Sequence, residues 1–449
     1  MGDLHAKYAN RSVPRYTSYP TAPHFRPAFP EVTYRSWLAE LDPHRPVSLY
    51  LHIPFCKQVC WYCGCNMKLA ARYEPVSEYL DRLIEEVELL AAALPGRMTL
   101  SHVHWGGGTP SVLRPDDLTR AMDAVWSNFD AAPEAELAIE CDPRTLEDDM
   151  SAAIGRLGFT RASFGVQEFA PEVQAAINRI QPPEMVEHVV TKLRQAGVKS
   201  INFDLIYGLP YQTEESLLET IEISHRMAPD RIALFGYAHV PWIAKNQRMI
   251  PEHALPDGKA RRTQAETAAN ALQTYGYQAI GLDHFALQDD ALSVAARAGN
   301  LHRNFQGYTT DSAHALLGVG ATSIGRTPHG YIQNIPETRA WSRAIAQGRL
   351  PVAKGIPLTE EDRLRGQVIE ELMCAGRADT AAIGAQRGRS ADWCDDELAR
   401  LAEFERDGLV KLEGSTVTLT KTGQSLARVV ASVFDAYLPK SEAKHSVAI

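Results

Sequence analysis

One short loop constrains the fold of this chain more than any other feature, because four of its seven cysteines lie there. They are Cys56, Cys60, Cys63 and Cys65, and the first three have the spacing C-x3-C-x2-C. Connections this short let three thiolates converge on one small inorganic core, and cysteine thiolates are the ligands that hold iron–sulfur clusters. A four-iron cluster held by three thiolates keeps one iron free for another ligand. The spacing therefore predicts a [4Fe–4S] cluster with an open iron.

Two other uses of the four thiols are open from their spacing alone. C-x2–4-C pairs suit tetrahedral zinc, although zinc ribbons usually divide their ligands between two distant pairs, and these four thiols are all local. A disulfide framework is typical of short secreted chains, whereas this chain has 449 residues. Zinc is thus the main alternative to a cluster.

The composition is that of a large acidic globular protein. Its hydrophobic fraction of 45% suffices for a sizeable core, and its formal net charge of −9 argues against nucleic acid as a partner. There is no apolar run of about 18 residues that would predict a membrane span, and the N-terminus lacks a signal-peptide core. Clustered reduced thiols fit a cytoplasmic protein. Nothing demands an oligomer, so we expect a monomer with no membrane partner.

From residue 47 onward, short β-rich runs alternate with longer helical runs. The expected strands are Val47–Ile53, Leu100–Trp105, Glu136–Cys141, Arg161–Gln167, Ser200–Ile206, Arg231–Tyr237 and Gln278–Asp283. The expected helices are Val76–Leu94, Pro115–Asn128, Leu146–Leu157, Pro183–Ala196, Glu214–Met227 and Lys259–Tyr275. Such alternation indicates βα units and a parallel sheet. The predicted fold class is therefore α/β, with about six units forming a partial or full barrel.

Unusual residues follow the carboxyl ends of these strands. The cysteine loop follows the first strand, Gly106–Gly108 follow the second, and Glu140, Gln167 and Asp204 lie at or near the ends of the next three. In βα barrels this end carries the active site. Three glycines in a row exceed what an ordinary turn needs and favour close approach of backbone to a ligand. Polar residues on one rim favour ligand contacts over isolated core salt bridges.

The two ends of the chain depart from this pattern. Residues 1–45 are rich in proline, which allows either a disordered leader or an arm draped over an active-site mouth. From about residue 350, two helices, a hairpin and a final helix indicate a winged-helix-like domain, expected over Thr359–Cys374, Asp396–Arg406, a turn leading to Val417–Leu419, and Thr422–Tyr437. No basic face stands out there, which favours a lid or packing role over DNA binding. The expected segments are 1–45, 46–345 and 346–449.

Other candidate residues carry weaker signals. His102 and His104 share one face of a strand, and His52 lies just before the cysteine loop, but such histidines are more often structural than metal ligands. Cys141, Cys374 and Cys394 have no partner spacing and are expected to be buried thiols.

The C-x3-C-x2-C loop after a strand, with the aromatic Tyr62 before the third cysteine, resembles the radical S-adenosylmethionine (SAM) superfamily. Four further features narrow the match from the superfamily to one family. They are Gly64-Cys65, the Arg-Tyr-Thr-Ser-Tyr-Pro-Thr-Ala run from Arg15, His-Trp-Gly-Gly-Gly-Thr-Pro at 104–110, and the loops at 304–310 and 318–325. Together they resemble the oxygen-independent coproporphyrinogen III oxidase family over most of the chain. The resemblance implies a partial (β/α)6 TIM-like radical SAM barrel with an N-terminal arm and a mostly helical, winged-helix-like C-terminal domain.

The resemblance also implies cofactors and their contacts. Cys56, Cys60 and Cys63 would hold the cluster, with Cys65 near it but not a ligand, and the fourth iron would bind SAM. Two SAM molecules are implied. By matching family positions, the first contacts Tyr50 and Glu140, with Gly107 and Ile324 nearby. Residues matched to the second are Gly108, Thr109, Gln167, Arg179, Asp204 and Ala238, and Tyr62 is a further expected cofactor contact.

The implied activity is the anaerobic oxidative decarboxylation of coproporphyrinogen III to protoporphyrinogen IX in haem biosynthesis, with a reductant such as flavodoxin or ferredoxin. The closest alternative is a radical SAM haem chaperone, although those proteins usually lack the Gly-Cys pair and the N-terminal run. A zinc-bearing structural or DNA-associated protein is the alternative from another class.

Overall fold

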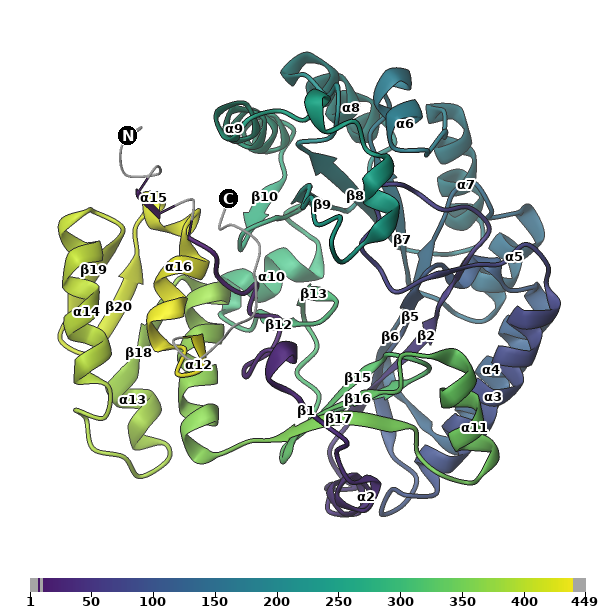
Figure 1. Ribbon diagram of the computed structural model, residues 1–449, viewed down its shortest axis with the longest axis horizontal. Coiled ribbons are helices and arrows are strands. Elements are labelled where there is room, and N and C mark those ends of the chain that lie inside the picture. The colour runs from purple at the N-terminus through teal and green to yellow at the C-terminus, as the bar shows by residue number, and fades with distance from the viewer. Residues whose placement is uncertain (1–6, 9–10, 439–449) are drawn as a thin grey trace. The chain divides into compact units, whose positions relative to one another are not determined.

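The computed structural model describes residues 7–8 and 11–438, and their contacts divide them into two compact units (Figure 1). The barrel unit comprises Arg26–Tyr277 and Asp311–Gly355. The composite unit draws on three separate parts of the chain: residues up to Phe25, Gln278–Thr310, and the residues from Ile356 onward. The three-segment division expected from the sequence remains a prediction, and the units are composed differently from it.

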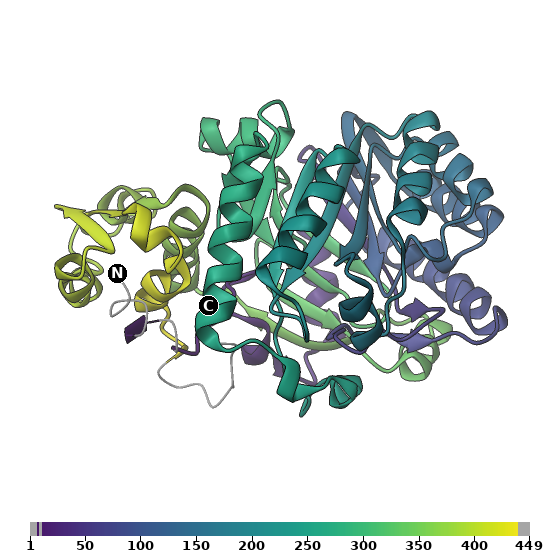
Figure 2. The ribbon, with the colours of Figure 1, turned by 90° about the horizontal axis from the view of Figure 1, so that it is seen from above.

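Six parallel strands form the centre of the barrel unit and pair in chain order. They are β2 (Val47–Ile53), β5 (Thr99–Gly107), β6 (Asp130–Cys141), β7 (Arg161–Gln167), β8 (Ser200–Tyr207) and β9 (Arg231–Gly236). The longer helices between and after them are α3 (Glu74–Ala91), α4 (Pro115–Asn128), α5 (Asp148–Arg156), α7 (Pro183–Gln195), α8 (Glu214–Arg226) and α9 (Gly258–Thr274). These helices cover the outer face of the strands (Figure 2). The expected α/β fold with a parallel sheet is confirmed.

The strands of this sheet are apolar because both of their faces are covered. In β7 and β8, Phe164 and Phe203 are fully buried and their rings meet edge to face at 6.3 Å. Before α8, the side chain of Thr213 accepts a hydrogen bond from the amide of Ser216, and the Ser216 hydroxyl lies 3.1 Å from the Thr213 amide. This capping box fixes where the helix begins.

On the other side of β2, the sheet continues through shorter strands. β14 (Leu316–Val319) pairs with β2 in parallel, and β15 (Ile324–Thr327), β16 (Gly330–Asn334), β17 (Val352–Pro357) and β1 (Arg26–Pro27) follow in that order. The glycine-rich stretch 318–325, expected as loop and short elements, therefore contains the end of β14 and the start of β15, joined by a turn. Two helices belong to this side, α2 (Glu31–Ala39) and α11 (Thr338–Ala346). The sequence pattern predicted no helix at α2.

Glu86 of α3 holds this extension in place although it is 2% exposed. Its carboxylate accepts hydrogen bonds from the amide of Gly320 at 2.8 Å, from Asn334 Nδ2 at 2.6 Å and from Trp341 Nε1 at 2.9 Å. Burial, only partly offset by these donors, raises the pKa of Glu86 to about 7. One carboxylate thus connects a barrel helix, the turn after β14, the end of β16 and α11.

The composite unit contains the expected winged-helix-like arrangement. Its elements are α12 (Glu360–Ala375), β18 (Arg377–Asp379), α13 (Thr380–Ala385), α14 (Asp395–Arg406), β19 (Val410–Glu413) and β20 (Thr416–Leu419), with sheet order β18-β20-β19. The final helix expected over 422–437 was wrong: three short pieces occur instead, α15 (Lys421–Gln424), α16 (Ala427–Ala431) and η5 (Ser432–Phe434). The backbone of Leu426 leaves the helical region, with φ −110° and ψ 18°, and interrupts the run.

The segment from residue 11 to Phe25 packs within this unit. Val13, Tyr16 and Tyr19 are buried in one core with Leu364 and Val368 of α12. The Tyr16 hydroxyl donates to Asp435 Oδ2 at 3.0 Å. Burial of these side chains excludes the disordered-leader interpretation for this segment, while a role at an active-site mouth remains a prediction.

The seventh expected strand, Gln278–Asp283, is shorter than predicted. β10 (Gln278–Ile280) is a short antiparallel partner of β11 (His284–Ala286), because Gly281 adopts φ +60° and the chain reverses there. α10 (Ala291–Ala298) follows, and then the two-stranded pair β12 (His302–Asn304) and β13 (Gly307–Thr309). The strand predicted here therefore ends at Ile280.

Candidate active site

The cysteine loop is closed at its base by a small ladder. β3 (Phe55–Cys56) and β4 (Lys68–Leu69) pair in parallel. The Lys68 amide donates to the Pro54 carbonyl at 2.7 Å, and the Ala70 amide donates to the Cys56 carbonyl at 2.9 Å. Cys60, Cys63 and Cys65 therefore lie on a loop whose two ends are fixed directly after β2.

Two side-chain amides from a short 3-10 helix, η3 (Lys245–Met249), bind the carbonyl groups of this loop. Asn246 Nδ2 lies 3.0 Å from the Cys60 carbonyl oxygen, 3.2 Å from that of Trp61 and 2.8 Å from that of Cys63. Gln247 Nε2 donates to the Tyr62 carbonyl at 2.8 Å and to the Ala238 carbonyl at 3.2 Å. Sequence reasoning missed both residues, because an Asn-Gln pair carries no signal until its partners in the cysteine loop, more than 180 positions away, are known.

The other side of the loop rests on the turn after α6 (Pro171–Ala176). The amide of Trp61 donates to the Ile177 carbonyl at 2.9 Å, and Asn178 Nδ2 donates to the Val59 carbonyl at 2.7 Å. Trp61 and Tyr62 pack against a buried cluster that includes Ile177. The loop is thus held from two sides and at its base.

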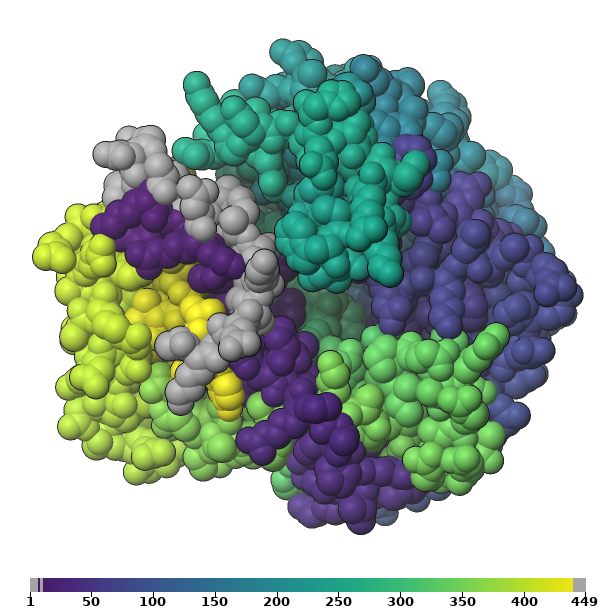
Figure 3. Space-filling view, in the orientation of Figure 1, coloured from purple at the N-terminus to yellow at the C-terminus, as the bar shows by residue number. Residues whose placement is uncertain are grey.

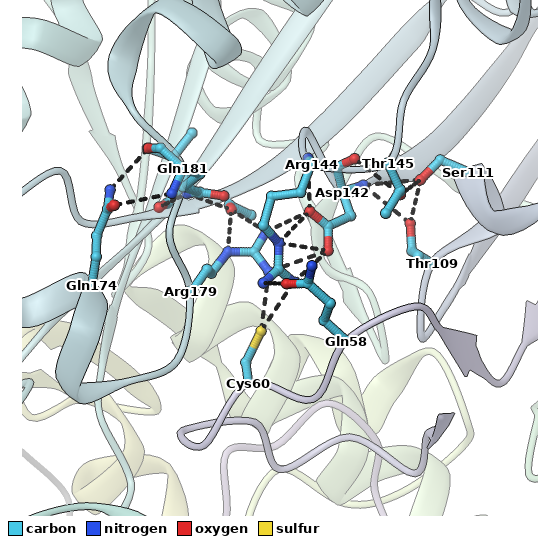
Figure 4. A network of polar contacts seen from close by, with 12 residues as sticks. Gln58, Cys60, Thr109, Ser111, Asp142, Arg144, Thr145, Gln174, Arg179 and Gln181 are labelled. Atoms are coloured by element: carbon cyan, nitrogen blue, oxygen red, sulfur yellow. Dashed lines mark hydrogen bonds and ion pairs between the residues drawn. The ribbon is translucent and has the colours of Figure 1, made fainter. Parts of the chain in front are cut away.

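Two guanidinium groups meet at the sulfur of Cys60 (Figure 4). Arg144 Nη2 lies 3.2 Å from Cys60 Sγ and Arg179 Nη1 lies 3.3 Å from it. Asp142 lies beside both, 2.6 Å from Arg144 Nη2 and 3.5 Å from Arg179 Nη2. Two buried cations facing one carboxylate leave one positive charge uncompensated next to the Cys60 sulfur. Arg179 was predicted as a site residue, whereas Arg144 was missed because its partner Cys60 lies 84 positions away in the chain.

The remaining loop thiols differ in their surroundings. The thiol of Cys65 hydrogen-bonds to Cys63, and the Cys65 amide lies 3.4 Å from Cys63 Sγ. These contacts lower the pKa of Cys63 to about 7 and raise that of Cys65. Burial raises the pKa of Cys56 to about 12 in the absence of a metal. N–H donors directed at Cys60 and Cys63 are the surroundings in which a thiolate metal ligand is stabilised.

Glu140, at the end of β6, lies beside the glycine run and an aromatic pair. Its carboxylate accepts from the Gly107 amide at 3.1 Å and contacts His104 Nε2 at 3.0 Å. Although burial opposes ionisation, His104 and the Gly107 amide lower the pKa of Glu140. Tyr50 stacks on His104, and its hydroxyl lies 3.0 Å from Nδ1 of His52. The structure therefore brings three predicted site residues together: Tyr50, Gly107 and Glu140.

The glycines at 106–108 leave no room for side chains. A Cβ at Gly106 would lie 2.8 Å from the Glu140 carboxylate, and one at Gly107 would lie 2.7 Å from the Ile53 carbonyl oxygen. At Gly108 it would lie 2.6 Å from the Phe55 carbonyl oxygen. Gly107 also adopts φ +122°, which favours glycine. These glycines bring β5 close to Glu140 and to the start of the cysteine loop, and their contact with a ligand stays a prediction.

The other predicted cofactor residues lie along the same rim or near it. Thr109 Oγ1 accepts from the Asp142 amide at 3.1 Å, which connects it to the arginine network. Gln167 adopts φ 68° and is 7% exposed, and its amide packs over Gly165 beside Arg179. Asp204 accepts from Asn202 Nδ2 at 2.9 Å. Ala238 joins the cysteine loop through Gln247, whereas Ile324 begins β15 beside Gly318.

Other candidates have structural partners. His102 Nδ1 lies 3.3 Å from Asp311 Oδ1. Cys141 and Cys394 are buried as expected, whereas Cys374 is only partly buried. Among the residues that the structure describes, no three His, Cys, Asp or Glu side chains form a group that could hold a single metal ion. The thiolates of a four-iron cluster bind different irons and need not meet at one point.

No helix within the described part of the chain is long and apolar enough to cross a membrane.

Comparisons with known proteins agree with this geometry. The radical SAM superfamily model matches residues 50–223. An oxygen-independent coproporphyrinogen III oxidase of Bradyrhizobium diazoefficiens is 47% identical over 447 residues, covering 100% of this chain and 99% of that protein. One from Cereibacter sphaeroides is 42% identical, covering 97% of this chain and 96% of that protein. The solved structure of coproporphyrinogen III oxidase from Escherichia coli, described as a radical SAM enzyme, superposes with a TM-score of 0.91 at 38% identity, covering 95% of this chain and 100% of that one.

The similarity covers the whole length of these relatives, including the cysteine loop, the rim and the C-terminal helices. At this identity and coverage, the chain belongs to the family of oxygen-independent coproporphyrinogen III oxidases within the radical SAM superfamily.

Proposed function

We propose that this protein catalyses the anaerobic oxidative decarboxylation of coproporphyrinogen III to protoporphyrinogen IX in haem biosynthesis. The propionates on rings A and B become vinyl groups. The observation that carries the proposal is the fixed cysteine loop, in which N–H donors from Arg144, Arg179 and the Cys65 amide are directed at the sulfurs of Cys60 and Cys63. The proposed substrate is taken from the close relatives, which are named coproporphyrinogen III oxidases.

The residues present fit a [4Fe–4S] cluster held by Cys56, Cys60 and Cys63. Three thiols on one closed loop supply the ligands, and the cationic surroundings of Cys60 suit a negatively charged thiolate. When bound, the cluster supplies the electron that cleaves SAM at its open iron and so generates the radical that removes a hydrogen atom from the substrate. Cys65 is proposed as a neighbour of the cluster, since its thiol and amide both contact Cys63.

The chain's own residues bind and orient the reactants and keep water out. Glu140, ionised and fixed by His104 and Gly107, is suited to a positively charged group such as the SAM amino group. Tyr50 and Ile324 are proposed to complete this first SAM site. A second SAM molecule is proposed to bind along the rim formed by Gly108, Thr109, Gln167, Arg179, Asp204 and Ala238, with Tyr62 nearby. The fixed backbone of the loop positions these groups without reorganisation during the reaction.

The same reaction converts each of the two propionates. A hydrogen atom leaves the β-carbon, the bond to the carboxylate breaks and releases CO2, and one electron leaves for an acceptor. What remains is the vinyl group.

We further propose that the protein acts in the cytoplasm as a monomer and that a separate reductant, such as flavodoxin or ferredoxin, supplies the electron that reduces the cluster.

An anaerobic assay with SAM, a reductant and coproporphyrinogen III tests the function. We expect CO2 release and vinyl-bearing porphyrin after oxidation of the product, from protein that is brown and contains iron and sulfide. Stoichiometric zinc without sulfide would refute the cluster. Tight haem binding with SAM cleavage but no vinyl product would instead indicate a haem chaperone.

A further inference from the structure

A group of apolar side chains is exposed on the segment after β9. Trp242 is 62% exposed, Ile243 is 69% exposed and Met249 is 58% exposed. Exposed apolar groups that lie together mark interaction sites more often than scattered ones do. Tryptophan, methionine and arginine are also enriched in protein interfaces. No part of the proposed reaction explains why this segment presents them to solvent.

This segment is bound directly to the cysteine loop. Asn246 and Gln247 of η3 point inward and hold the carbonyls of Cys60, Tyr62 and Cys63. Lys245, Arg248 and Met249 of the same short helix are exposed. One side of η3 therefore contacts the chain that carries the thiols, and its other side is surface. In the space-filling view this teal-green segment lies beside the violet-blue chain that includes the loop (Figure 3).

The exposed charges here are positive, in a protein whose net charge is −9. Residues 57–68 and 240–251 include Lys57, Lys68, Lys245 and Arg248 and contain no Asp or Glu. Lys68 lies 3.9 Å from Glu337. Among the residues that the structure describes, Lys57, Lys245 and Arg248 have no ion-pair partner. The next acid along the chain is Glu252, whose Oε1 lies 3.1 Å from His239 Nε2. This surface thus combines unneutralised cations with exposed apolar side chains.

We propose that this surface, defined by Lys57, Trp242, Ile243, Lys245, Arg248 and Met249, docks a small acidic one-electron donor protein that carries a reduced flavin or iron–sulfur centre. The proposal rests on the proposed function, since it needs a cluster behind the loop. The donor is oxidised by one electron and the cluster is reduced by one. Complementary charge steers such encounters, and the apolar side chains supply the contact once the partners meet. Docking at this position brings the donor against the chain that holds the thiols.

The test compares two sources of electrons for the same SAM-cleavage reaction, one being flavodoxin in its hydroquinone form and the other dithionite. The variants are the double substitution Lys245→Glu/Arg248→Glu and the single substitution Trp242→Ser. Lys199→Glu and Val32→Ser are matched controls, because Lys199 is an exposed lysine at the opposite end of the sheet and Val32 is 73% exposed on α2. None of these residues is placed in the cofactor site.

With flavodoxin we expect the double variant to raise the KM for the donor on the order of tenfold, an effect that shrinks as salt is added, while dithionite-driven cleavage is unchanged. Trp242→Ser should raise the same KM with little dependence on salt. Flavodoxin-driven rates equal to wild type in both variants would overturn the proposal, and so would an equal loss with both electron sources. Wild-type protein that cleaves no SAM even with dithionite would refute the proposed function itself.

Discussion

Asn246→Ala should loosen the cysteine loop and accelerate loss of the cluster. The Asn246 amide carries two hydrogens and faces three carbonyl oxygens at 2.8–3.2 Å, so it makes two full hydrogen bonds at a time. At about 1 kcal/mol for each, plus part of the cost of leaving those carbonyls unpaired, the loop loses ~2–3 kcal/mol of its preference for the bound conformation. Because ordering the loop precedes metal binding, we expect cluster retention to weaken roughly 30- to 150-fold.

The assay follows iron release to a coloured chelator under anaerobic conditions, after reconstitution of each variant to the same iron and sulfide content. Lys245→Ala is the matched control, since Lys245 precedes Asn246 in η3 but is exposed. Circular dichroism of the metal-free proteins establishes that each variant is folded. An Asn246→Ala protein that releases iron within twofold of the wild-type rate would refute the reasoning. Asn246→Asp should be worse than alanine, because a carboxylate would then face the three carbonyls.

Three further predictions concern the loop, the rim and the sheet extension. Cys60→Ser should lose iron and activity together in anaerobic preparations, whereas Cys65→Ser should keep its iron; an active Cys60→Ser protein would remove the proposed ligand. Gly107→Ala should weaken SAM binding at least ~10-fold in equilibrium dialysis, because its Cβ would lie 2.7 Å from the Ile53 carbonyl oxygen at a φ of +122°; wild-type affinity would contradict this. The pKa of about 7 for Glu86 exceeds the ~4.3 of an unfolded glutamate, so its contribution to stability is present at pH 4 and lost as pH rises through about 7. The thermal midpoint of Glu86→Gln should therefore rise relative to that of the wild type as the pH is raised from 5 to 8. Parallel pH profiles of the two midpoints would show that Glu86 does not titrate there.

Local patterns in the sequence were sufficient to predict most of the barrel. The predicted bounds of β2, β7 and α4 match the structure, because a continuous apolar run or an amphipathic stretch begins and ends there in the sequence itself. α2 was missed because it begins after Pro30 without a side-chain cap. β14 and β15 were not assigned as strands, only as part of a region of loop and short elements, because glycines interrupt them; neighbouring strands supply their pairing.

Some contacts of the candidate site could likewise be predicted from the sequence, and others could not. Glu140 and Gly107 could be predicted to meet, since both lie at the carboxyl ends of neighbouring parallel strands and such ends share one edge. Their observed contact at 3.1 Å agrees with that argument. Arg144 and Asn246 could not be predicted, because each acts through a partner far away in the chain and neither residue type is unusual in a loop. Only the folded backbone brings them to the cysteine loop.

The composite unit also sets an order of events during translation. Tyr16 and Tyr19 leave the ribosome well before Leu364 and Phe434, which belong to the core that buries them. The parallel strands β2 to β9 emerge in one uninterrupted stretch, and segments of this kind begin to fold while the rest is still being made. A nascent chain stalled at residue 350 would therefore contain the central strands of the barrel, whereas the residues of α12 and η5 that bury Tyr16 and Tyr19 would not yet have been made.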